Sequence, residues 1–209
     1  DVAGVDGRGG FDTVTLQSAG DTVTLIDVES VTGSANADIV FIDNENTFAT
    51  VNLAAGNDIF KVDVFTDFGA GTTLDGGAGT DQLLVNNTTI TLVDLSLVSL
   101  QGTETIDTDG GAAAGVQLVI DGLDIQDVDT ISGDGTTDIL TLSGSANLTP
   151  VTTIDASFSV MNIRSGLTAT VDDTKLSPFT TLNGTVGGEE QITTTSATTN
   201  IEGKTFTDI

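Results

Sequence analysis

The sequence contains no cysteine, histidine, tryptophan or tyrosine, and only 5 of its 209 residues are lysine or arginine. Without cysteine, the fold has neither disulfide bonds nor thiolate metal sites. Without histidine or cysteine, there is no Ser-His-Asp or Cys-His triad and no general base that titrates near neutrality. Catalysis would need paired carboxylates or a Ser–Lys pair, and Lys61, Lys175 and Lys204 lie in no recognisable Ser-x-x-Lys motif. We therefore expect that the protein is not an enzyme.

Long hydrophobic runs are also missing, because no stretch approaches 18 consecutive apolar residues. We therefore expect no membrane insertion. The 31 acidic residues give a net charge of −26, which argues against nucleic acid or an anionic membrane as a partner. Divalent cations would relieve the self-repulsion of this charge. A mean hydropathy of +0.18 and a hydrophobic content of 38% favour an ordered chain over a disordered one.

The most informative stretch that is present runs from Leu74 to Val85, with the sequence LDGGAGTDQLLV. Its glycines allow the positive-φ and close-approach conformations of a tight turn. In such a turn, backbone carbonyls and the Asp81 carboxylate can converge on a hard cation. The residues that follow Asp81 are typical of a short β-strand.

Copies of this stretch recur along the chain. Three copies precede it, with Asp12, Asp38 and Asp58, and one follows it, with Asp138. From Asp12 to Asp38, Asp58 and Asp81, successive aspartates are 26, 20 and 23 residues apart. Ala114–Ile120 fills the same slot with Gly115 in place of aspartate, and Leu182–Glu189 is a degraded copy. A period of about 20–26 residues is typical of a solenoid.

Segments of alternating apolar and polar residues lie between these turns, for example Leu25–Val31, Leu100–Ile106 and Leu123–Ile131. Alternation of this kind predicts half-buried strands, so each repeat holds at least two strands. The fold class we predict is an all-β, right-handed parallel β-solenoid with coils of about 20–26 residues. We expect aliphatic residues to stack inside it as ladders; these are Ile39, Ile59, Leu83, Val116 and Ile139.

The domain organisation that we expect is a single solenoid domain over residues 1–209 that forms part of a longer protein. Asp1–Val5 has neither a positive n-region nor an apolar h-region, so we expect no signal peptide there. The domain divides into regular coils at 1–85, a looser coil with a loop at 86–115, regular coils at 116–142 and degenerate Thr-rich coils at 143–209. Within the last part, Asp172–Pro178 predicts an irregular break or a short helical turn.

The stretch Leu74–Leu83 resembles the glycine- and aspartate-rich nonapeptide of the RTX, or hemolysin-type, calcium-binding repeat proteins. It alone keeps the full Gly-Gly-x-Gly-x-Asp spacing, and each turn motif occurs once per coil rather than in tandem. The resemblance implies Ca²⁺ as cofactor and a secreted, extracellular location on the bacterial cell surface. The metal ligands that it implies are turn carboxylates: Asp6, Asp12, Asp38, Asp58, Asp75, Asp81, Asp134 and Asp138.

The function we expect is structural: a calcium-stabilised protein that assembles into an S-layer, filament or adhesin stalk. Its partners would be copies of itself, head to tail or laterally, and cell-surface polysaccharide. Two alternatives are a β-helix that binds or cleaves polysaccharide and a secretion module that folds on meeting calcium. Polysaccharide binding is disfavoured because basic and aromatic side chains are few.

Several features also have simpler interpretations. The turn aspartates can accept hydrogen bonds from backbone amides instead of binding metal. Glu29, Glu104 and Asp127 are interpreted as a solvated ladder rather than as ligands. The Thr-x-Thr pairs suggest an ice-binding face, but their irregular recurrence favours ordinary β propensity.

Overall fold

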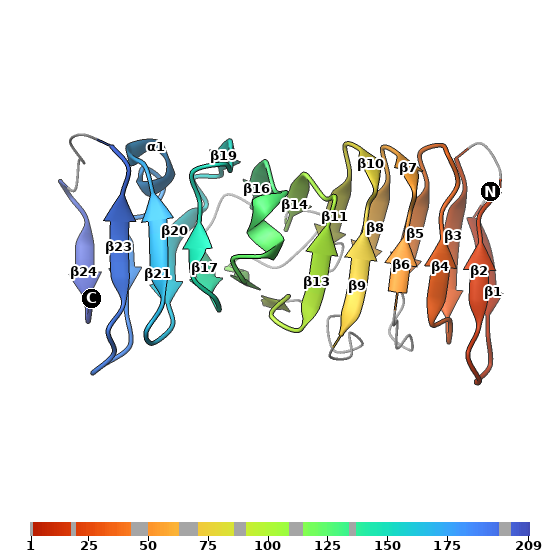
Figure 1. The fold of residues 1–209 in the computed structure, drawn as a ribbon, viewed down its shortest axis with the longest axis horizontal. Helices are drawn as coiled ribbons and strands as arrows, with labels where there is room; N and C mark the ends of the chain where they lie inside the picture. The colour runs from red at the N-terminus through yellow and green to blue at the C-terminus, as the bar shows by residue number, and fades with distance from the viewer. Residues whose placement is uncertain are drawn as a thin grey trace. The chain divides into compact units, whose positions relative to one another are not determined.

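The structure is a computed structural model that describes residues 2–17, 20–42, 50–62, 71–85, 91–108, 115–133, 137–196 and 202–209. These residues form short parallel strands that stack coil upon coil, which confirms the prediction of a parallel β-solenoid (Figure 1). The chain divides into two compact units, and each is described by itself. Unit 1 comprises Asp1–Ile90 and Leu97–Ala112, and unit 2 comprises Thr91–Ser96 and Ala113–Ile209.

Unit 1 contains two main sheets, and the chain alternates between them in every coil. The strands of its first sheet are β1 (Val2–Asp6), β3 (Thr22–Ile26), β5 (Ile39–Ile42), β8 (Ile59–Val62), β11 (Gln82–Val85) and β14 (Thr105–Asp107). Those of its second sheet are β2 (Thr13–Thr15), β4 (Ser30–Thr32), β6 (Thr50–Asn52), β9 (Thr72–Asp75) and β13 (Val98–Gln101). A short pair, β7 (Ala55–Gly56) and β10 (Ala78–Gly79), lies in the turns between the two sheets.

Unit 2 is also built from parallel sheets. The largest holds β12 (Leu92–Asp94), β15 (Gln117–Ile120), β17 (Asp138–Leu142), β20 (Phe158–Ile163), β22 (Thr181–Asn183) and β24 (Thr205–Thr207). Elsewhere in unit 2, β16 (Thr130–Ser132) pairs with β19 (Thr153–Ile154), and β21 (Thr168–Val171) pairs with both β18 (Ala146–Asn147) and β23 (Gln191–Thr194). The helical pieces are a 3₁₀ turn, η1 (Asp124–Gln126), and α1 (Asp173–Leu176).

Helix α1 confirms the short helical turn predicted at Asp172–Pro178. Asp172 is its N-cap, and its side chain accepts hydrogen bonds from the backbone amides of Thr174 and Lys175. This satisfies two amides that a first helical turn otherwise leaves unpaired.

The core of unit 1 consists of ladders of aliphatic and aromatic side chains. In the first sheet, the register aligns Val23, Val40, Phe60, Leu83 and Ile106 on the inside, each at most 2% exposed. The second sheet aligns Val31, Val51, Leu74 and Leu100 on the inside, each at most 3% exposed. Each coil thus buries apolar side chains against its neighbours, at about 1.5–3 kcal/mol for each large side chain.

The predicted interior ladder is wrong at three of its positions. Ile39, Ile59 and Ile139 are half-buried on the outer side of their strands, whereas Leu83 and Val116 are fully buried. The reason is the period of two along a strand. The aspartate before each of these isoleucines is itself turned inward, so the isoleucine points outward and the next residue points inward.

Candidate functional site

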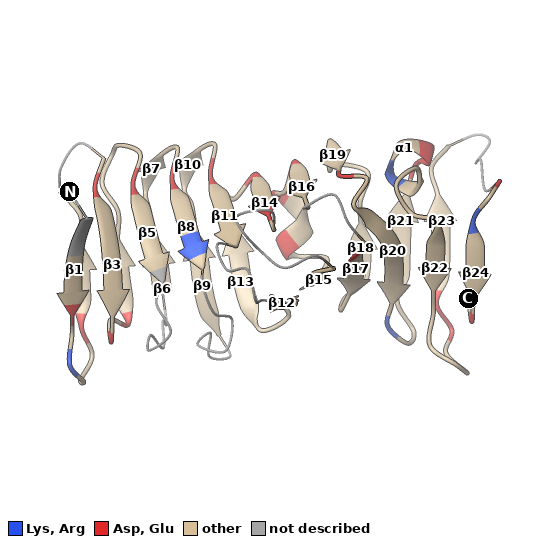
Figure 2. Cartoon of the chain, turned by 180° about the vertical axis from the view of Figure 1, so that it is seen from behind, with Lys and Arg blue, Asp and Glu red and all other residues tan. Residues whose placement is uncertain are grey.

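Three similar turns form one edge of unit 1. They span residues 33–38, 53–58 and 76–81, and each leads from the second sheet to a strand of the first sheet. Figure 2 shows acidic residues gathered at this edge, above β3, β5, β8 and β11. Each turn ends in an aspartate with no exposed surface: Asp38, Asp58 and Asp81. The recurrence seen in the sequence therefore places these three carboxylates at matching positions in successive coils.

These carboxylates bond each coil to the one before it. The backbone amide of Asp38 donates to Oδ1 of Asp58 at 2.6 Å, and the amide of Asp58 donates to Oδ1 of Asp81 at 2.7 Å. The row continues at both ends, since the Asp21 amide donates to Asp38 and the Asp81 amide donates to Glu104. We call the five residues Asp21, Asp38, Asp58, Asp81 and Glu104 the carboxylate ladder. Hydrogen bonds from amides to ionised carboxylates are shorter and stronger than neutral ones, so the ladder fixes the coil register.

The second carboxylate oxygen distinguishes the members of the ladder. Oδ2 of Asp38 accepts the amide of Ser34 at 2.7 Å, within its own turn. Oδ2 of Asp58 and Oδ2 of Asp81 are buried and have no hydrogen-bond partner among the described residues. The middle of the ladder therefore has carboxylate oxygens that are removed from water but not paired.

Burial changes the acidity of these two groups. It raises the pKa of Asp58 from 3.8 to about 6; the amide bond from Asp38 opposes this rise, and the charges of Asp81 and Asp38 add to it. Burial also raises the pKa of Asp81, with the charges of Glu104 and Asp75 acting in the same direction. Stacked carboxylates in a dry turn thus disfavour their own ionisation.

Asp12 lies on the opposite edge of unit 1. Its turn leads from the first sheet to the second, and its amide donates to Oε2 of Glu29 at 2.8 Å. Its Oδ2 is buried and unpaired. The Asp12 copy therefore belongs to a separate acidic pair and not to the row of Asp38, Asp58 and Asp81.

Asp138 repeats the arrangement in unit 2. It is fully buried at the start of β17, its Oδ1 accepts the amide of Val116 at 2.9 Å, and its Oδ2 is unpaired. Because Gln117 is in register with Ile139, Val116 stands where the aspartate would be. The assignment of that slot to Gly115 is wrong by one residue.

The remaining predicted ligands are placed elsewhere or are not described. Asp6 is exposed, with Oδ2 3.6 Å from Nε of Arg8. Asp75, at the end of β9, accepts a hydrogen bond of 2.8 Å from Nδ2 of Asn52 on the neighbouring strand. Asp134 lies outside the described residues.

Glu29 and Glu104 belong to the acidic edges, although the sequence analysis interpreted them as solvated. Both are half-buried, and they accept the amides of Asp12 and Asp81. A signal for this role was present: each stands directly before a strand, as Asp81 stands directly before β11. Asp127, the third member of the supposed ladder, is exposed.

The donor set fits a hard cation only in part. Two unpaired carboxylate oxygens occur in adjacent coils, and strands of adjacent coils lie about 4.7–4.9 Å apart. Among the described residues, no group of three acidic side chains is arranged to hold a metal ion. Ca²⁺ accepts backbone carbonyl and water oxygens as well as carboxylates, so a site here would depend on the turn backbone.

The fold and the carboxylate ladder define a class of protein: a parallel β-solenoid with stacked acidic turns. Comparison with family models, curated proteins and solved structures finds no match to this chain. In the described part of the chain, no helix has the length and hydrophobicity required to span a bilayer.

Proposed function

We propose that this chain is a structural, calcium-stabilised solenoid of a secreted bacterial surface protein, which assembles with copies of itself. The observation that carries the proposal is the pair of buried, unpaired Oδ2 atoms of Asp58 and Asp81 in adjacent coils. Within this proposal, Asp58 and Asp81 each have two roles: one oxygen bonds the preceding coil, and the other is available to a cation.

The energetic argument for a cation starts from desolvation. An ionised carboxylate that loses water without gaining a partner costs several kcal/mol, and neighbouring carboxylates raise that cost. Either a proton or a metal ion removes the penalty. Ca²⁺ prefers oxygen ligands, so Asp58 and Asp81, together with turn carbonyl oxygens, are the residues that would hold it.

Calcium binding would also explain a structural role outside the cell. A ligand that binds only the folded state stabilises it by mass action, by about 2.7 kcal/mol when its concentration is one hundred times the Kd. Sites with few charged ligands bind at Kd values on the order of 10⁻⁴–10⁻³ M, which is the range of extracellular calcium modules. The folded state of such a protein would be less stable inside the producing cell and more stable outside it, where the protein would assemble with copies of itself.

The test compares calcium binding in the wild type, Asp81→Asn and Asp6→Asn by isothermal titration calorimetry and thermal unfolding. The two substitutions change the net charge equally, but Asp6 is exposed and outside the ladder. We expect calcium to raise the melting temperature of the wild type and of Asp6→Asn. We expect Asp81→Asn to lose at least one site and part of that increase.

An unchanged melting temperature of the wild type between chelator and excess calcium would overturn the calcium proposal. Self-assembly is tested separately, by sedimentation velocity over a range of protein concentrations with calcium present. A monomer at every concentration would overturn that part alone.

A further inference from the structure

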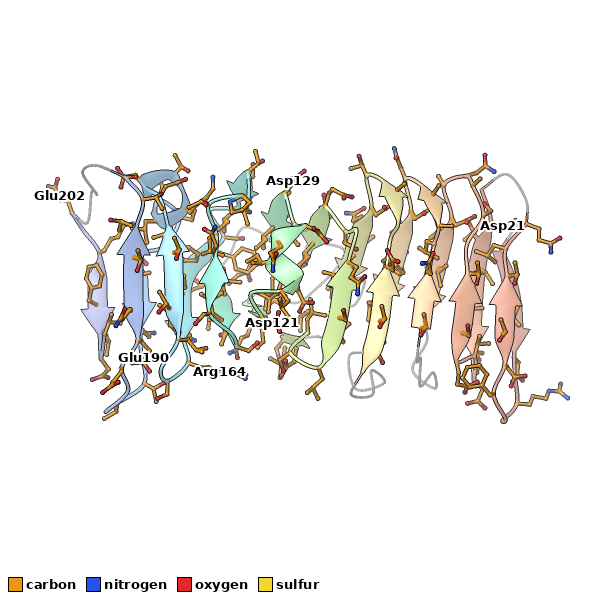
Figure 3. All side chains as sticks on the ribbon, viewed as in Figure 1. Asp21, Asp121, Asp129, Arg164, Glu190 and Glu202 are labelled. Atoms are coloured by element: carbon orange, nitrogen blue, oxygen red, sulfur yellow. The ribbon has the colours of Figure 1, made fainter. Side chains whose placement is uncertain are left out.

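The turn between β22 and β23 in unit 2, residues 184–190, differs from the turn of the preceding coil. Thr168 is in register with Gln191, so Glu190 lies level with Leu167, the last residue of the shorter turn 164–167. In the longer turn, the Gly188 amide donates to the carbonyl of Thr185 at 2.7 Å, with Gly187 at a φ of +76°. Figure 3 labels Glu190 at this edge of unit 2. This turn places the carboxylate of Glu190 against residues of its own loop.

Glu190 is a buried carboxylate without a partner. It is 6% exposed, and neither Oε1 nor Oε2 has a hydrogen-bond partner among the described residues. The salt bridge between Arg8 and Asp6 lies in the other unit and does not involve Glu190. In contrast to Asp58 and Asp81, which each have one oxygen satisfied, Glu190 has none.

Two glycines of the loop lie against this carboxylate. A Cβ atom on Gly188 would clash with both carboxylate oxygens, and one on Gly184 would lie 2.9 Å from Oε2. The Glu190 head group therefore lies directly against the backbone of its own loop. A side chain at Gly188 would displace this head group, and one at Gly184 would clash first with the backbone carbonyl of Asp208.

An ionised carboxylate cannot remain buried against bare backbone without compensation, because the desolvation cost amounts to several kcal/mol. We propose that loop 184–190 binds a divalent cation of the calcium class through both oxygens of Glu190 and carbonyl oxygens of the loop. The chain offers no cysteine or histidine, so a hard, oxygen-preferring cation fits and a soft metal does not.

This site deepens the calcium part of the proposed function but does not use the carboxylate ladder. Its single glutamate head group gives a low ligand charge, so we expect a Kd on the order of 10⁻⁴–10⁻³ M. No motif with Gly-Gly-x-Gly-x-Asp spacing occurs here, since the loop reads GTVGGEE.

The experiment measures Ca²⁺ stoichiometry by isothermal titration calorimetry in the wild type, Glu190→Gln, Asp129→Asn and Asp81→Asn. Asp129 is an exposed acidic residue of unit 2, so Asp129→Asn reproduces the charge change of Glu190→Gln away from the loop. We expect Glu190→Gln to bind one Ca²⁺ fewer than the wild type, and Asp129→Asn to bind the same number. In chelator, Glu190→Gln should melt no lower than Asp129→Asn, because it removes an uncompensated buried charge.

Wild-type stoichiometry in Glu190→Gln overturns this site, and so does a melting temperature in chelator below that of Asp129→Asn. If Asp81→Asn binds fewer Ca²⁺ ions than the wild type and Glu190→Gln binds the same number, the proposed function is supported and this site is excluded. If only Glu190→Gln binds fewer Ca²⁺ ions, this site is supported and calcium binding at the carboxylate ladder is excluded. Gly188→Ala is a second variant. Its methyl group would occupy the space of the Glu190 carboxylate oxygens without changing the charge, so it should also bind one Ca²⁺ fewer.

Discussion

At the scale of single residues, the aspartates of this solenoid behave as interior residues. Asp38, Asp58 and Asp81 occupy inward positions at the ends of turns and have no exposed surface. What makes this possible is an amide from the coil before, which satisfies one oxygen of each carboxylate. The cost is that ionisation of Asp58 and Asp81 is disfavoured, as their raised pKa values show.

A pH dependence follows from Asp58. Its pKa is about 6 in the folded chain and about 3.9 in an unfolded one, so the folded state holds the proton more tightly. Its contribution to stability is therefore fully present below about pH 4 and is lost as the pH rises through about 6. In chelator, we expect the urea midpoint, followed by circular dichroism, to fall between pH 4 and pH 6.5.

Asp58→Asn is the control for this dependence, because it keeps the shape of the side chain but does not titrate. The variant should show a smaller fall over the same interval. A midpoint that rises with pH in both proteins would contradict the assignment.

At the scale of elements, the acidic turns depend on close backbone approach. Gly79 has a φ of +153°, a conformation that L side chains rarely adopt, and a Cβ there would clash with the carbonyl oxygen of Gly56 on the neighbouring coil. The pairing of β7 with β10 thus requires glycine at this point. By contrast, Gly166 has a φ of +74°, and a Cβ added there would meet no atom within 4 Å.

These two glycines give a matched pair of alanine substitutions. Gly166→Ala should lower the free energy of unfolding by about 1 kcal/mol, the usual cost of a left-handed L residue. Gly79→Ala should cost about 2–5 kcal/mol, because overpacking adds to a strained backbone. Urea unfolding followed by circular dichroism measures both, since the chain has no tryptophan or tyrosine for fluorescence. Equal costs would show that the contact with Gly56 carries no strain.

At the scale of the whole molecule, the dominant property is the net charge of −26. Charge of one sign destabilises a folded chain through self-repulsion, and dissolved salt screens it. Any salt is therefore expected to stabilise this protein to some degree, whether or not a specific metal site exists.

This sets a requirement for the calcium proposal. At equal ionic strength, CaCl₂ should raise the melting temperature by more than NaCl does, because screening is then the same and only site binding differs. Differential scanning calorimetry measures the two increments. Identical increments would mean that the charge needs only screening and that no turn binds calcium specifically.

The sequence by itself determined the fold class, because glycine-aspartate turns and alternating strands recur at the period of one coil. It also indicated that Asp38, Asp58 and Asp81 are equivalent, since the same local pattern surrounds each of them. It did not determine which side of a strand faces inward. That was decided in three dimensions by the aspartate, which takes an inward place and sets the alternation of the residues after it.

The tertiary structure decided on which edge the other carboxylates lie and how each carboxylate is satisfied. Asp12 carries a similar motif yet lies on the opposite edge, because its turn leads from the first sheet to the second. Glu29 and Glu104 join the acidic edges because stacking brings an amide of the preceding coil to each carboxylate. Hydrogen bonds of this kind join residues 17–23 positions apart, and such pairs exist only once the register between coils is fixed.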